Sequence, residues 1–256
     1  MTPNLPESLL KVPLAHRALH DASQGRPENS RAAIRAAMQA GYGIEIDLQL
    51  SSDGQALVFH DYDMGRLTGH SGAIRQCSAA EAGKTILKNS DGETIPTLVE
   101  ILDLVAGQVP LLIELKDQDG GMGPDIGALD GAAAAALKGY CGPVAVMSFN
   151  PHSVAELARL APDLPRGLVT ESYDPAHLPL SAATCDRLRD FPDFERCRAS
   201  FISHEMHDLP RPRVQELRRA GVPVLCWTIR SPEDEAQARR YADNVTFEGY
   251  LAAIPD

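Results

Sequence analysis

The sequence contains few of the features that mark secreted or membrane-spanning proteins. Its five cysteines are widely spaced and form no C-x-x-C pair, so neither a disulfide framework nor a zinc or redox motif is indicated. No apolar run approaches the ~20 residues of a membrane helix, and the first residues do not resemble a signal peptide. We therefore expect a soluble, cytoplasmic protein with reduced thiols.

Basic residues are also in short supply. The chain has 24 Lys and Arg against 35 Asp and Glu, for a net charge of -11. An acidic surface repels phosphate backbones and anionic lipid headgroups, which argues against nucleic-acid binding and stable membrane association. A small phosphate-containing substrate would need a bound cation or a few well-placed basic side chains. The glycine-rich nucleotide loops and the G-x-S-x-G nucleophile motif are absent as well.

Short apolar runs alternate with helical patterns along the 256 residues. We expect strands at 12–16, 44–50, 56–60, 109–116, 143–147, 166–169, 199–203, 222–229 and 244–247. We expect helices at 28–40, 98–106, 126–138, 154–160, 211–220 and 232–241, a weakly indicated one between the strands at 166–169 and 199–203, and a short one after residue 247. About eight strand–helix units are typical of a (β/α)8 TIM barrel, although a doubly wound open sheet has the same alternation.

Residues 61–94 have weaker periodicity and are best explained as an insertion after the second strand. No low-complexity tract or linker divides the chain. We therefore expect a single α/β domain over residues 1–256.

The strand at 44–50 carries the clearest chemical signal. Side chains alternate between the two faces of a strand, so Glu45, Asp47 and Gln49 share one face. Both faces of a parallel barrel strand are normally apolar, and two buried carboxylates repel each other unless a cation lies between them. Glu114 and Lys116 share a face of the strand at 109–116 in the same way.

Glu45, Asp47 and Glu114 together form an all-oxygen set that suits Mg²⁺ or Ca²⁺ better than zinc. The alternative is a structural ion-pair network in which Lys116 supplies the counter-charge. Two histidines, His16 and His60, end the first strand and the short run at 56–60. Catalytic residues collect at the carboxyl ends of barrel strands, and such a pair suits proton transfer on both sides of a phosphodiester.

These residues resemble the signature of the glycerophosphodiester phosphodiesterase family. The resemblance spans residues 12 to about 229 and is carried by His16-Arg17, Pro27-Glu28-Asn29-Ser30, Glu45-Ile46-Asp47, Asp53-Gly54, His60-Asp61, Ile95-Pro96-Thr97-Leu98, Glu114-Leu115-Lys116, Ser148-Phe149 and Trp227-Thr228. It implies a (β/α)8 barrel with a small insertion, and hydrolysis of glycerophosphodiesters to glycerol 3-phosphate and an alcohol with Mg²⁺ or Ca²⁺.

The same resemblance implies roles for single residues. Metal ligands correspond to Glu45, Asp47 and Glu114, and acid/base histidines to His16 and His60. Arg17 would contact the phosphate and Lys116 would line the same pocket. Phe149 and Trp227 would either pack in the core or stack against the substrate.

Three positions depart from the family pattern and leave the alcohol preference open. Ala18 replaces a glycine, Arg230 replaces an asparagine, and Phe247-Glu248-Gly249 replaces Thr-Asp-Pro. Two other functions stay open beside the main one: a lysophospholipase D-like phosphodiesterase, and a non-catalytic protein that binds a phosphate metabolite on the same fold. The sequence indicates no oligomeric state.

Overall fold

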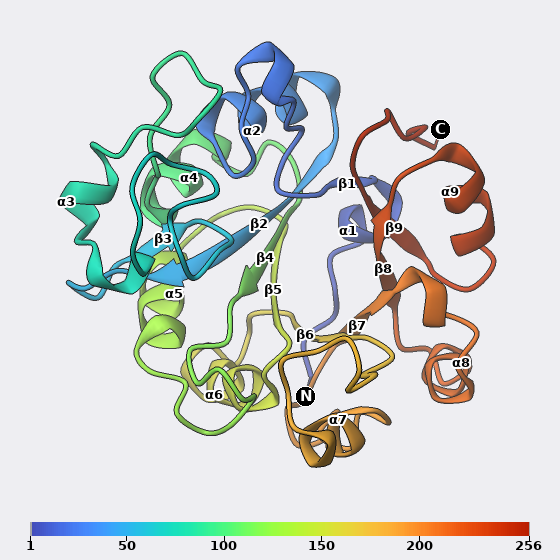
Figure 1. Ribbon diagram of the computed structural model, residues 1–256. Helices are drawn as coiled ribbons and strands as arrows, with labels where there is room; N and C mark the ends of the chain where they lie inside the picture. Colours follow the sequence, from blue (N-terminus) through green and yellow to red (C-terminus); the bar gives the residue numbers. More distant parts are fainter. Residues whose placement is uncertain (1, 256) are drawn as a thin grey trace.

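Eight parallel strands close into a barrel in the computed structural model, which describes residues 2–255 (Figure 1). These strands are β1 (Leu14–Ala15), β2 (Gly43–Leu50), β4 (Leu111–Leu115), β5 (Val144–Ser148), β6 (Arg166–Thr170), β7 (Phe201–Glu205), β8 (Val224–Ile229) and β9 (Asn244–Phe247). Strand β1 pairs with both β2 and β9, so the ring has no free edge. Closure excludes the open doubly wound sheet and confirms the predicted barrel.

The helices and 3-10 turns lie around this ring or against its amino end (Figure 1). They are α1 (Ser8–Lys11), α2 (Arg31–Ala40), α3 (Ala79–Ala82), α4 (Leu98–Val105), α5 (Leu129–Leu137), α6 (Pro151–Leu160), α7 (Ala182–Leu188), α8 (Pro212–Arg219) and α9 (Pro232–Ala238), with 3-10 turns η1 (Ala22–Gln24), η2 (Ile74–Gln76) and η3 (Met206–Asp208). Helix α7 lies between β6 and β7, where the sequence indicated a helix only weakly. None of the helices within residues 2–255 is long and apolar enough to cross a membrane.

The predicted helices differ from the observed ones by up to about three residues at their ends, and one predicted helix is absent from the described residues. The helix expected from residue 28 begins at Arg31, because the Ser30 hydroxyl accepts the Ala33 amide and caps the first turn. The short helix expected after residue 247 is wrong, since the described residues 248–255 contain none. Gly249 takes a left-handed conformation there, and the Ala252 carbonyl accepts a bond from the Tyr42 hydroxyl instead of a helical partner.

The barrel interior changes from apolar to polar along the strands. Near their amino ends, inward-facing side chains form an apolar cluster that includes Leu14, Leu112 and Phe201, and Leu5 and Leu9 close this end. Polar side chains follow on the same inward faces toward the carboxyl ends. The apolar cluster fills the amino end of the barrel, so the polar side chains at the carboxyl end are the ones that can contact a ligand.

The insertion follows a hairpin rather than a ninth barrel strand. Strand β3 (Ala56–Val58) pairs antiparallel with β2, with Leu48 opposite Val58. Residues of β3 and of the insertion form a separate, small apolar cluster. Its members are Leu57, Phe59, Ile74, Cys77, Ala82, Leu87 and Ile95. This separate core holds the insertion beside the carboxyl end of β2.

Asp130 is a buried acid on an outer helix, away from the barrel interior. Asp130 on α5 is only 2% exposed, and its nearest polar partner is the Ser153 hydroxyl of α6, 3.4 Å from Oδ2. The other carboxyl oxygen, Oδ1, is buried without a hydrogen-bond partner among the described residues. Burial raises the pKa of Asp130 to about 7.

We expect Asp130→Asn to stabilise the protein increasingly as the pH rises. The folded state keeps the Asp130 proton up to about pH 7, whereas the unfolded chain releases it near its ordinary pKa, so stability falls between these values. The variant escapes this loss, and its advantage in unfolding free energy should grow by roughly 2 kcal/mol between about pH 5 and about pH 8. Urea unfolding followed by circular dichroism measures it, with the exposed Asp125→Asn as control. A difference in unfolding free energy between Asp130→Asn and the wild type that does not change with pH would contradict the raised pKa of Asp130.

Candidate active site

Three carboxylates meet inside the carboxyl end of the barrel. Glu45 and Asp47 lie on β2 and Glu114 lies on β4, and the strand register places Asp47 directly beside Glu114. Their exposed fractions are 2%, 1% and 6%, respectively. One oxygen from each lies within 4.8 Å of the others, which is close enough for all three to ligate one ion. The structure therefore brings together the three residues that the sequence indicated as metal ligands.

Lys116 supplies only part of the charge that this cluster needs. Its Nζ lies 2.7 Å from Asp47 Oδ1 and 2.6 Å from Glu114 Oε1, so the predicted ion pairs do form. Burial would lower the pKa of Lys116, but the two carboxylates raise it above its ordinary value. Glu45 has no ion pair within 4.0 Å in residues 2–255. Burial and the charges of Asp47 and Glu114 raise the pKa of Glu45 well above its ordinary value.

The charge of the three carboxylates is only partly balanced by nearby basic side chains, which is compatible with a cation site. Lys116 neutralises one of the three carboxylate charges, and the nearest other cation, Arg17, lies with its Nε 3.7 Å from Asp47 Oδ2. Burial alone would raise the pKa of Asp47, yet Lys116, His60 and Arg17 hold it below its ordinary value. Buried carboxylates with an incomplete counter-charge and hard oxygen donors fit a divalent cation.

A tight loop after β1 carries Arg17 into this site. Arg17 and Ala18 both have positive φ, 52° and 64°, and the Arg17 amide donates to Glu45 Oε2 at 2.9 Å. The left-handed conformation at residue 18 accounts for the glycine that the family pattern has there, since glycine adopts it without steric cost. Ala18 accepts this strain and leaves the loop geometry intact.

Asn29 completes the surroundings of Asp47. Its amide nitrogen donates to Asp47 Oδ2 at 2.9 Å, and its carbonyl oxygen accepts the Asp47 backbone amide at 3.2 Å. Asn29 also has a positive φ of 57°, a conformation that asparagine tolerates better than most residues. The sequence pattern contained Asn29 within a matching motif but assigned it no role.

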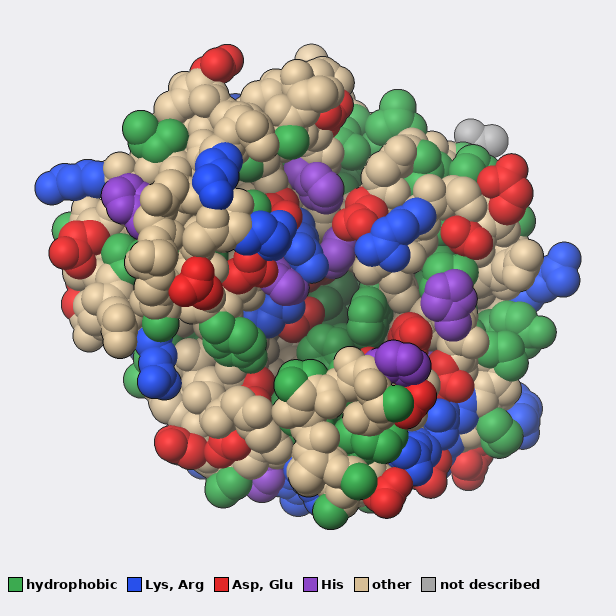
Figure 2. Space-filling model, in the orientation of Figure 1, with side chains coloured by type: hydrophobic (Ala, Val, Ile, Leu, Met, Phe, Trp, Pro, Cys, Tyr) green, Lys and Arg blue, Asp and Glu red, His purple; other side chains and the backbone are tan. Residues whose placement is uncertain are grey.

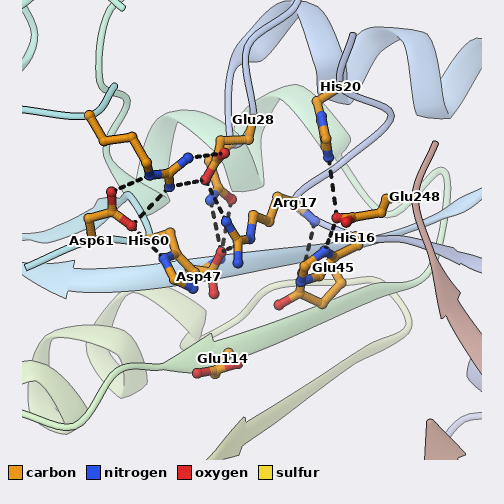
Figure 3. Close-up of polar contacts among 12 residues, drawn as sticks. His16, Arg17, His20, Glu28, Glu45, Asp47, His60, Asp61, Glu114 and Glu248 are labelled. Atoms are coloured by element: carbon orange, nitrogen blue, oxygen red, sulfur yellow. Dashed lines mark hydrogen bonds and ion pairs between the residues drawn. The ribbon is translucent and has the colours of Figure 1, made fainter. Parts of the chain in front are cut away.

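His16, directly after β1, is held by a residue from the opposite end of the chain. Its Nδ1 lies 2.6 Å from Oε2 of Glu248, which follows β9 (Figure 3). Arg230 donates to Glu248 Oε1 at 2.8 Å, and His20 Nε2 lies 3.7 Å from Glu248 Oε2. Burial lowers the pKa of His16, although Glu248 opposes that shift. Two of the departures from the family pattern, Arg230 and Glu248, thus form one charged pair beside His16.

His60, two residues after β3, has a carboxylate partner of its own. Its Nδ1 lies 2.7 Å from Oδ1 of the adjacent Asp61. Burial, followed by the charge of Lys116, lowers the pKa of His60 to about 4, so the ring is neutral near pH 7. Both histidines are therefore held through Nδ1, which leaves Nε2 as the nitrogen available for proton transfer.

Two cavities open beside these groups at the centre of the molecule (Figure 2). One of about 270 Å³ is lined by His16, Arg17 and Glu45 together with Phe149 and Trp227. The other, of about 510 Å³, lies under the insertion, and His60, Glu114, Lys116 and Phe149 line both.

Phe149 and Trp227 form an edge-to-face pair in the smaller cavity. Their ring centroids are 5.5 Å apart, and the Trp227 Nε1 donates to the Ser203 carbonyl at 3.0 Å. The two rings pack in the barrel and also face the cavity, so the two roles considered for them are compatible. They give the smaller cavity an apolar wall suited to a carbon skeleton.

Besides Asn29, sequence reasoning assigned no role in the site to four charged residues around it. Glu248, Glu28, Asp61 and Arg66 each contact a candidate site residue directly or through one carboxylate. Glu28 and Asp61 stand inside motifs that resembled the family, and this is the only signal that pointed to them. Arg66 lies in the weakly patterned insertion, where nothing in the sequence indicated it.

Comparison with known proteins identifies the family of the chain. The model of the Glycerophosphoryl diester phosphodiesterase family matches residues 16–245. A glycerophosphodiester phosphodiesterase of Caldanaerobacter subterraneus subsp. tengcongensis is 29% identical over 232 residues, which cover 86% of each chain. One from Bacillus subtilis is 28% identical over 247 residues, or 90% of this chain and 79% of the relative.

Solved structures extend the similarity to the fold. An Oleispira antarctica phosphodiesterase, solved in complex with the product sn-glycerol-3-phosphate, superposes with a TM-score of 0.73 at 25% identity, covering 93% of both chains. A glycerophosphodiester phosphodiesterase from Parabacteroides distasonis has a TM-score of 0.72 at 23% identity, covering 93% of this chain and 92% of that one. The chain therefore belongs to the glycerophosphoryl diester phosphodiesterase family, whose members are phosphoric diester hydrolases.

Proposed function

We propose that the protein hydrolyses glycerophosphodiesters to glycerol 3-phosphate and an alcohol, and that it needs Mg²⁺ or Ca²⁺ to do so. The observation that carries this proposal is the group of three buried carboxylates with one lysine among them. The glycerol 3-phosphate bound by the Oleispira antarctica relative supports the product. Glu45, Asp47 and Glu114 would hold the cation.

The charges around the site suit a phosphodiester. A divalent cation held there would supply positive charge that stabilises the negative charge developing on the phosphate oxygens. Arg17 faces the smaller cavity and Lys116 faces both cavities, so both can bind the remaining phosphate oxygens. Without a cation, three carboxylates and two basic groups would leave the pocket unfavourable for an anion.

His16 and His60 would divide the proton transfers. We propose that one accepts a proton from the attacking hydroxyl, of water or of the substrate's own glycerol, and that the other donates a proton to the departing alcohol. Glu248 and Asp61 hold the two rings at Nδ1, so Nε2 would carry the proton in each case. Phe149 and Trp227 would cover the carbon atoms of the glycerol group and keep water from them.

We expect release of glycerol 3-phosphate from glycerophosphocholine to stop when EDTA removes divalent cations, and to return when Mg²⁺ or Ca²⁺ is restored. The measurement is a coupled assay for glycerol 3-phosphate, with Zn²⁺ as a third ion because oxygen ligands favour it less. Turnover that EDTA leaves unchanged would contradict the metal requirement.

A parallel assay of choline release, a product common to both substrates, separates the other functions considered. Lysophosphatidylcholine offered in parallel should be hydrolysed far more slowly than glycerophosphocholine. Faster release of choline from the lysophospholipid would assign the chain a lysophospholipase D-like activity. Binding of glycerol 3-phosphate without turnover of either diester would indicate a non-catalytic binding protein.

A further inference from the structure

Arg66, in the insertion, joins two carboxylates that lie far apart in the sequence. Its Nε and Nη2 donate to the two oxygens of Asp61 at 2.6 and 2.9 Å. Its Nη1 and Nη2 donate to the two oxygens of Glu28 at 2.7 and 2.8 Å. One guanidinium group therefore binds both carboxylates in a bidentate manner, an arrangement that a point charge such as the lysine ammonium does not reproduce.

Each of these carboxylates in turn holds a candidate site residue. Glu28 Oε1 accepts from Arg17 Nη1 at 2.8 Å, and Asp61 Oδ1 lies 2.7 Å from His60 Nδ1. Glu28, Asp61, Arg17 and His60 are labelled in Figure 3, where dashed lines connect them around Asp47. Arg66 thus links the proposed phosphate-binding arginine with a proposed proton-transfer histidine through these two carboxylates.

The charges in this network depend on Arg66. Burial would raise the pKa of Glu28, but Arg66 and Arg17 hold it below its ordinary value. Burial would likewise raise the pKa of Asp61, and Arg66 and His60 lower it. Without Arg66, Glu28 would be left to Arg17 alone and Asp61 to His60 alone, and nothing would hold the two carboxylates at a fixed separation.

The exposure of Arg66 favours a role in positioning the site residues over a role in stabilising the fold. Its side chain is 49% exposed, and half-exposed ion pairs contribute little to folding free energy. The orientation of reacting groups is far more sensitive, because a displacement of about 1 Å can lower a rate about 100-fold. Loss of Arg66 should therefore affect the reaction much more than the fold.

We propose that Arg66 is a positioning residue that orients Arg17 and His60 together, through Glu28 and Asp61, and so couples the insertion to the active site. This inference rests on the proposed function of those two residues. It assigns the insertion a task beyond covering the larger cavity. Arg66 also lines the larger cavity, but its guanidinium donors are directed to Glu28 and Asp61 and not to the three carboxylates of the cation site.

The test compares Arg66→Gln and Arg66→Lys with Lys84→Gln, which removes one exposed positive charge from the same insertion. Arg66→Gln should lower kcat by about 10- to 100-fold, with thermal unfolding close to that of the wild type. Arg66→Lys should recover only part of the loss, and Lys84→Gln should stay within about twofold of the wild type. An Arg66→Gln enzyme with at least half the wild-type kcat would overturn the proposal.

A double-mutant cycle checks that Arg66 acts through its carboxylate partner. In an Asp61→Asn background, Arg66→Gln should cost much less than it does in the wild type, because the route to His60 is already lost. If the losses in kcat caused by the two substitutions are independent and additive, the proposed route from Arg66 through Asp61 to His60 is wrong. If Arg66→Gln unfolds more easily than expected, the cycle is repeated with Arg66→Lys, which keeps the positive charge, and the losses in kcat are compared for that variant.

NMR of the His60 ring nitrogens provides a readout that does not need turnover. The wild type should show a single tautomer with the proton on Nδ1, facing Asp61, and Arg66→Gln should show a mixture. An unchanged His60 signal in Arg66→Gln would overturn the positioning role even if the chain hydrolysed no diester. Absence of turnover with the expected NMR change would instead count against the proposed function alone.

Discussion

Replacing Asp47 by asparagine should weaken divalent-cation binding and turnover together. The substitution keeps the shape of the side chain but removes a charge from the most buried member of the carboxylate group. Asp47 also holds Lys116 and accepts from Asn29, so the lost charge would not be replaced by a neighbour. We expect turnover to fall on the order of 100-fold or more, and calorimetric titration with Mg²⁺ and Ca²⁺ to show a parallel loss of affinity.

The control for this prediction is Asp103→Asn, an exposed carboxylate on α4. It removes the same charge far from the barrel interior and should change neither turnover nor the affinity for Mg²⁺ and Ca²⁺. If Asp47→Asn lowers thermal stability but binds Mg²⁺ and Ca²⁺ as the wild type does, the carboxylates serve only the ion pairs with Lys116. That result would favour the structural network considered from the sequence over the metal site.

Replacing His16 or His60 by alanine should have an equally large effect of a different kind. Each ring is proposed to transfer a proton, a contribution that is commonly about 100- to 10,000-fold in rate. Neither is a proposed metal ligand, so both variants should bind Mg²⁺ or Ca²⁺ with nearly unchanged affinity while kcat falls by that factor. Circular dichroism should show an intact barrel.

The exposed His177, on the segment between β6 and α7, offers a matched control. His177→Ala removes an imidazole that lines neither cavity and should leave kcat unchanged. Near-normal turnover in either His16→Ala or His60→Ala would rule out the two-histidine mechanism. Loss of metal binding in those variants would show that the histidines act on the cation site rather than on protons.

Much of the fold was predictable because barrel strands and their helices leave periodic patterns. Residues 44–50 alternate so regularly that the inward face of β2 could be deduced before its neighbours were known. The helix after residue 247 failed because the pattern there was too short to weigh against Gly249 and the Tyr42 contact. The strand at 56–60 was expected, and its antiparallel pairing came from the turn at Asp53 and Gly54.

The candidate site was predictable where a residue belonged to a strand, and much less so where it belonged to a loop. Glu45, Asp47 and Glu114 converge because parallel strands align their inward faces. Arg66 and Glu28 are 38 residues apart, and no periodicity connects them.

By itself, the sequence determined that Glu45 and Asp47 share one face of β2, since side-chain direction follows from the strand period alone, and that His16 follows the first barrel strand. It placed His60 at the end of a second strand, but β3 ends at Val58 and lies outside the ring of parallel strands. Only the tertiary structure decided that Glu248 meets His16 across 232 positions of the chain, and that Lys116 pairs with two carboxylates while Glu45 has no ion pair among residues 2–255. These contacts depend on ring closure between β1 and β9 and on loop conformations, neither of which a local pattern of residues encodes.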